Sequence, residues 1–174
     1  MNILTGYATA HGSTAEVADF IGQELERREF AVTVANVADV ISVADYDAFV
    51  LGSAVHDGMW LTEMSQFLER FQDKLKIAPM LYFMTCVRVL EQGGEAHARQ
   101  EYANHRVLNE LNVKEIAVFA GRLELETVDW DQRWTLAARY DGSRPGGSFN
   151  RDFRDWEKIR AWTQRAADHL LMPG

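Results

Sequence analysis

Short apolar runs alternate with longer segments of helical periodicity along this 174-residue chain. A short apolar run is typical of a strand buried in a sheet, whereas an apolar position at every third or fourth residue is typical of a helix with one face toward the core. Strands that alternate with helices form parallel sheets covered on both sides. Five strands are expected, at 2–7, 31–36, 48–53, 80–85 and 115–121.

Four segments between and after these strands have the spacing of amphipathic helices. They are 13–28, 61–75, a polar helix around 95–111, and a last helix with an apolar stripe from Trp156 to Leu170. The prediction is an α/β fold: a doubly wound, five-stranded parallel sheet with helices on both faces, strand order 2-1-3-4-5 being the leading option. No repeat or linker interrupts the pattern, so residues 1–174 are expected to form one domain, with an insertion at about 122–150 before the last helix.

The charge balance excludes several classes of protein. Lys and Arg total 18 against 26 Asp and Glu, a formal charge of -8, which disfavours a nucleic-acid partner. Residues 1–80 hold 12 acids and 5 bases, so most of the excess acidity lies in that half.

The single Cys86 rules out an internal disulfide and any multi-cysteine metal site. With no bilayer-length apolar stretch and no signal segment at Met1, the expectation is a cytoplasmic protein.

The turn after the first strand has the composition of an anion site. Hydroxyl side chains and Gly12 lie where a strand gives way to a helix, and backbone N–H groups at a helix start favour a phosphate. The turn has no Lys or Arg and no GxGxxG spacing, so it is neither a P-loop nor a dinucleotide loop. It suits the single phosphate of a mononucleotide. Alternatively, Ser13 only caps the helix and Glu16 completes a capping box; the two interpretations are compatible.

Four segments carry a family resemblance over nearly the whole chain. They are GYATAHGSTAE at 6–16, YDAFVLGSAVHDGMW at 46–60, VFAGRL at 118–123 and DFRDWEKIRAW at 152–162. They resemble flavodoxin-like proteins, closest to the branch that contains the menaquinone-type protoporphyrinogen oxidases of bacteria. The resemblance implies a flavodoxin-like sheet and the cofactor FMN.

The resemblance also implies three groups of FMN-binding residues. Thr9, His11, Gly12, Ser13 and Thr14 would hold the phosphate. A loop beside the isoalloxazine ring would comprise Ala54, Val55, His56, Asp57, Gly58 and Trp60, and a loop on its other edge Thr85, Cys86, Val87 and Arg88. No catalytic residue is assigned, and no metal site is expected because His97 and His105 are eight residues apart.

Some of these residues have a second interpretation. Trp60 is either a group that stacks on the flavin or a core residue at a helix start, and Cys86 is most simply inert filling. Arg88 either places a positive charge near the reduced ring or is a surface residue. The third loop lacks the aromatic residue that typical flavodoxins lay against the ring, which would leave space for a substrate or quinone.

Three functions follow as hypotheses. The first is an FMN-dependent oxidoreductase of the protoporphyrinogen oxidase type, which passes electrons from an organic substrate, a porphyrinogen in that branch, to a quinone. The second is a flavodoxin-type electron carrier that serves a redox partner protein, and the third is a flavin-free binding module. The segment 122–150 has four bases and five acids, so at most peripheral contact with the inner membrane face is expected. No pattern indicates the oligomeric state.

Overall fold

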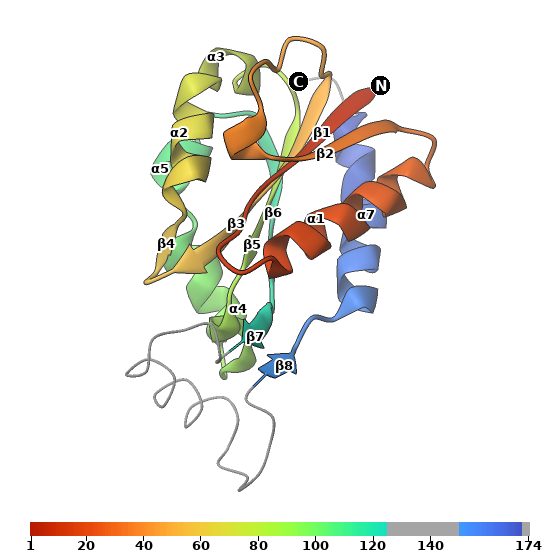
Figure 1. Cartoon of the computed structure of the whole chain (residues 1–174). Coiled ribbons are helices and arrows are strands. Elements are labelled where there is room, and N and C mark those ends of the chain that lie inside the picture. Colours follow the sequence, from red (N-terminus) through yellow and green to blue (C-terminus); the bar gives the residue numbers. More distant parts are fainter. Residues whose placement is uncertain (125–149, 172–174) are drawn as a thin grey trace, which may run out of the picture.

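The computed structural model of the chain describes residues 1–124 and 150–171 (Figure 1). Its centre is a parallel sheet in the order β2-β1-β3-β5-β6. These strands are β1 (Asn2–Ala8), β2 (Ala31–Asn36), β3 (Ala48–His56), β5 (Met80–Thr85) and β6 (Val113–Phe119). They are the five expected strands, and the order 2-1-3-4-5 and the doubly wound α/β class are confirmed.

Two helical layers cover the sheet, one on each face (Figure 1). On one face lie α1 (Ser13–Glu26) and α7 (Trp156–Leu170). The other face is covered by α2 (Thr62–Arg70), α3 (Gln72–Leu75), α4 (Gly94–His97), η3 (Ala98–Tyr102) and α5 (His105–Leu108). Two short 3-10 turns, η1 (Val37–Asp39) and η2 (Val87–Leu90), follow strands β2 and β5.

Neighbouring residues of one strand enter opposite cores, as the pleat of a doubly covered sheet requires. Ile3 packs with α1 and α7, whereas Leu4 packs with α2 on the other face. Val50 lies in the α1–α7 core, and its neighbours Phe49 and Leu51 lie in the opposite one. Burial on both faces explains why these strands read as apolar runs.

Two expected helices are interrupted. The segment 95–111 forms α4, the single π-helical turn η3 and α5, because Ala103 takes an extended ψ of 114° and the Asn104 side chain accepts a hydrogen bond from the Val107 N–H at 3.3 Å. This cap starts a new helix at His105. The segment 61–75 is divided into α2 and α3 at Phe71, whose φ of −113° is not helical.

Two antiparallel additions were not expected from the sequence. The two-residue strand β4 (Met59–Trp60) folds back on the end of β3. Strands β7 (Arg122–Glu124) and β8 (Asn150–Asp152) pair with each other and join the ends of the predicted insertion, of which 125–149 lie outside the described residues. Within the described ranges, no helix has the length and apolar character needed to cross a bilayer.

Candidate functional site

The three loops expected to bind a cofactor follow the carboxyl ends of β1, β3 and β5, which are adjacent in the sheet. Ala8 is the register partner of Ser53, and Ala54 is the partner of Thr85. The chain turns to opposite sides of β1 to form β2 and β3, so this edge is a topological switch point, where open α/β sheets bind ligands. The fold thus brings residues from three distant segments to one edge.

The first loop leaves the start of α1 without a side-chain cap among the described residues. Gly12 occupies the N-cap position with φ of +86°, and the Thr9 hydroxyl accepts a hydrogen bond from the Gly12 N–H at 2.9 Å. The capping-box interpretation is therefore wrong: Ser13 is the first helical residue, and the Glu16 carboxylate is bonded to two arginines instead. The N–H groups left without a cap can donate hydrogen bonds to an anion, and the helix dipole favours its negative charge.

Of the other first-loop residues, His11 is exposed and Thr14 is fully buried. The Thr14 and Thr85 hydroxyls share a hydrogen bond of 2.7 Å. This bond joins the first loop to the third, so the Thr14 side chain has a structural role in the flavin-free protein.

The second loop is a tight hairpin. Ala54 and Val55 lie on β3 itself, and β3 turns into β4 through Asp57 and Gly58, which have φ of +50° and +76°. These left-handed conformations favour a glycine, and they bring backbone to the tip of the hairpin at this edge. His56 and Asp57 are both exposed, with His56 Nδ1 and Asp57 Oδ2 3.3 Å apart.

Trp60 belongs to the hairpin, and its side chain lies in the core. It is 9% exposed, its ring centroid is 4.7 Å from that of Tyr82, and its indole N–H donates to the Met84 Sδ at 3.3 Å. This placement favours the interpretation of Trp60 as a core residue over that of a group stacked on the flavin. It also differs from the expected helix start, because Trp60 belongs to β4 and α2 begins at Thr62.

The third loop starts from Thr85 and continues into η2. Cys86 is buried, and burial raises the pKa of its thiol, as expected of inert filling rather than of a reactive cysteine. Val87 is half-buried in η2. Arg88 is 31% exposed and paired with Glu91 at 2.8 Å, so its charge is offset locally.

The carbonyl oxygen of Arg88 lies close to Gly94. A Cβ built on Gly94 would lie 1.8 Å from that carbonyl oxygen, so only glycine fits there and the course of the third loop depends on it.

Among the described residues, no three His, Cys, Asp or Glu side chains are grouped so that they could hold a metal ion.

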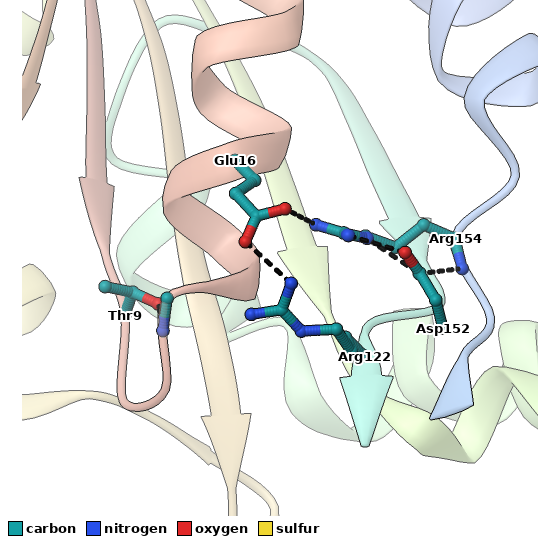
Figure 2. Close-up of polar contacts among 6 residues, drawn as sticks. Thr9, Glu16, Arg122, Asp152 and Arg154 are labelled. Atoms are coloured by element: carbon teal, nitrogen blue, oxygen red, sulfur yellow. Dashed lines mark hydrogen bonds and ion pairs between the residues drawn. The ribbon is translucent and has the colours of Figure 1, made fainter. Parts of the chain in front are cut away.

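A cluster of four charged residues adjoins the first loop (Figure 2). Glu16, in the first turn of α1, contacts Arg122 of β7 at 2.8 Å and Arg154 at 2.7 Å. Arg154, whose side chain is 4% exposed, also binds the Asp152 carboxylate at the end of β8 through Nη2 at 2.6 Å and Nε at 2.8 Å. The Arg154 guanidinium holds the pKa of Glu16 and of Asp152 below their ordinary values.

The sequence contained no local signal for this cluster. Glu16 and Arg154 are 138 residues apart, and Arg122 and Asp152 lie opposite each other only because β7 and β8 pair. The capping box was one of two interpretations of the turn that contains Glu16, and the motif at 152–162 indicated only the family. The cluster connects β7 and the residues at the end of β8 to α1, the helix that follows the first loop.

These features define a class of protein: a doubly wound α/β protein whose switch point holds a helix start without a described side-chain cap. The chain belongs to the flavodoxin family, since the sequence model described as "Flavodoxin domain" matches residues 4–141. The likeness to solved structures concerns the fold. Flavodoxin 1 from Bacillus cereus is 16% identical with a TM-score of 0.59, covering 97% of this chain and 99% of its own. A flavodoxin from the domain Archaea is 13% identical with a TM-score of 0.57, covering 99% and 100%.

A curated relative is similar over almost its whole length. It is the protoporphyrinogen IX dehydrogenase [quinone] of Escherichia coli strain K12, 22% identical over 175 aligned positions that cover 98% of this chain and 96% of the relative. The aligned part therefore includes the region between β6 and α7. Together with the family, this likeness supports a flavodoxin-type flavin protein.

Proposed function

We propose that this chain binds FMN and is an oxidoreductase of the protoporphyrinogen oxidase type, which takes electrons from an organic substrate and delivers them to a quinone. The observation that carries the proposal is the likeness to the E. coli protoporphyrinogen IX dehydrogenase along 98% of the chain. That likeness extends past the five-stranded sheet, through the segment between β6 and α7.

The first loop fits the phosphate of FMN, the cofactor generally expected of the flavodoxin family. Ser13 and Thr14 present backbone N–H groups at a helix start that no described side chain caps. A Cβ on Gly12 would have no described atom within 4 Å, so this side of the turn is open to a ligand. FMN, when bound, would accept electrons from the substrate and release them to the quinone.

The other two loops provide the surroundings of the ring. The β3–β4 hairpin would place the backbone of Gly58 beside one edge, and η2 would lie at the other. Beyond η2 an open groove of about 800 Å³ is lined by nine residues, among them Val89, Glu91 and Gly94. In this proposal a planar substrate or quinone approaches over the third loop, which has no aromatic side chain to cover the ring. Because menaquinone is a lipid, peripheral contact with a membrane is part of the proposal.

The test has two stages. Purified protein is first titrated with FMN, and binding is followed by flavin absorbance and fluorescence. The loaded protein is then assayed anaerobically for protoporphyrinogen oxidation with a menaquinone analogue, with unloaded protein as the control. We expect saturable binding and FMN-dependent turnover. Binding without turnover would favour an electron carrier, and a chain that takes up no FMN would be a flavin-free module.

A further inference from the structure

The first loop has no Lys or Arg of its own, but the fold brings a guanidinium next to it. Arg122 extends from β7 toward the first turn of α1, where its Nη1 lies 2.8 Å from Glu16 Oε1 (Figure 2). The preceding residue, Gly121, runs directly against the helix start: a Cβ built on it would lie 3.5 Å from the Ser13 hydroxyl. Arg122 is therefore adjacent to the residues proposed to hold the FMN phosphate.

The charges in the cluster have different degrees of exposure. Arg154 is 4% exposed and is bound to two carboxylates, those of Glu16 and Asp152, so it is enclosed within the cluster. The Arg122 side chain is 28% exposed. Of the two guanidiniums, Arg122 is thus the one that solvent, or a ligand at the helix start, can reach.

The cluster also offsets a repulsion between Glu16 and a phosphate bound at the helix start. A carboxylate in the first turn of α1 would repel a phosphate bound at the same helix start. Arg154 and Arg122 both contact the Glu16 carboxylate and offset its charge, and Arg122 is the more exposed of the two. A guanidinium is a planar fork of five donors that can contact a carboxylate and a phosphate together, which the point charge of a lysine does less well.

We infer that Arg122 is a positioning residue for the FMN phosphate, held in place by Glu16. The inference rests on the proposed function, because it assumes that the first loop binds FMN. In this arrangement the phosphate is held by the amides and the dipole of α1 and also by a cation from the strand that leads into the 125–149 segment. The alternative is that Arg122 serves only as a structural partner of Glu16.

Comparison of FMN with riboflavin separates the two roles, because riboflavin has the same ring without the phosphate. Dissociation constants of both flavins are measured by fluorescence titration of the unloaded protein at low and at physiological salt. The variants are Arg122→Gln, Arg122→Lys and the control Arg160→Gln. Arg160 also pairs α7 with α1, through Glu24, but lies away from the first loop. Thermal unfolding of the unloaded variants reports any loss of structure.

We expect Arg122→Gln to weaken FMN binding about tenfold or more, the effect of losing one charge-assisted contact. Riboflavin binding should change less than about twofold, and the salt dependence of FMN binding should become shallower. Arg122→Lys should be intermediate, and Arg160→Gln should match the wild type. If Arg122→Gln weakens both flavins equally, or neither, while the wild type prefers FMN, Arg122 has no role at the phosphate. A wild-type protein that binds neither flavin would overturn the proposed function itself.

Discussion

The hydroxyls of Thr14 and Thr85 form a buried hydrogen bond of 2.7 Å across 71 residues of sequence. Thr14 lies in the first turn of α1 and Thr85 at the end of β5, so the bond links the loop proposed for the phosphate to the loop proposed for the far edge of the ring. Replacing Thr85 with Val should destabilise the flavin-free protein by about 1–3 kcal/mol, because the Thr14 hydroxyl remains buried without a partner.

A double-mutant cycle checks this. Thr14→Val with Thr85→Val should cost less than the sum of the single substitutions, since no hydroxyl is then left unsatisfied. Thr5→Val is the matched control: the Thr5 hydroxyl is fully buried and has no hydrogen-bond partner among the described residues, so its loss should be neutral or stabilising. Strictly additive costs in denaturant unfolding would mean that the two threonines are not coupled.

Gly12 and Gly93 form a matched pair for separating cofactor binding from folding. Both have positive φ, +86° and +71°, and a Cβ on either would meet no described atom within 4 Å. Valine at either position should cost a similar amount of stability, about 1–2 kcal/mol of backbone strain. FMN affinity should fall at least about tenfold for Gly12→Val only. Equal losses of affinity in the two variants would assign Gly12 a role in folding alone.

The Glu16 cluster predicts acid sensitivity. The pKa values of Glu16 and Asp152 are lowered in the folded state, chiefly by hydrogen bonds from Arg154. Because these pKa values are lowered by folding, the two carboxylates contribute their full stabilisation above their ordinary pKa values, 4.5 and 3.8. That contribution is lost as the pH falls through their lower pKa values in the folded protein.

Glu16→Gln should therefore lose about 1 kcal/mol at pH 7, a modest amount because the Glu16 side chain is 44% exposed and its pairs are screened. The difference from the wild type should shrink toward pH 3, where both lack the carboxylate charge. Urea unfolding from pH 7 to pH 3 measures this, with Glu26→Gln, at an exposed position of the same helix, as the control. A difference that stays constant with pH would contradict the ion-pair explanation.

Cys86 should be slow to react in the native protein. Its thiol is 8% exposed, and burial raises its pKa, so the fraction present as reactive thiolate at neutral pH is small. Labelling with a thiol reagent at pH 8 should be at least about tenfold slower in buffer than in denaturant, which exposes the group. Rapid labelling of the folded protein would instead mark Cys86 as an accessible residue of the third loop.

A variant without residues 125–149 tests what the segment between β7 and β8 contributes. Glu124 and Asn150 are register partners in β7 and β8, so a two-residue Asn-Gly turn can join them. We expect the shortened protein to retain FMN binding, because Arg122 and Asp152 remain, but to lose quinone-linked turnover. Unchanged turnover would show that the segment builds no part of the substrate site.

The class of fold was readable from the sequence, because burial on both faces makes the central strands β1, β3 and β5 apolar. Segments 31–36 and 80–85 matched β2 and β5 residue for residue, and Val17, Ile21 and Leu25 marked the buried face of α1. The first loop was recognisable for the same reason: a strand, a short hydroxyl-rich turn and a helix are contiguous in the chain.

Only the tertiary structure decided what each side chain near the site contacts. Trp60 lies in the core, and Glu16 binds Arg122 and Arg154 in place of a capping box. Local patterns report the face of a helix or strand that is buried. They do not report pairing between residues more than 100 positions apart, which depends on how β7, β8 and α7 are positioned against α1. The sequence therefore determined the sheet and the location of the turn between β1 and α1, and the packing of distant segments determined the charges beside it.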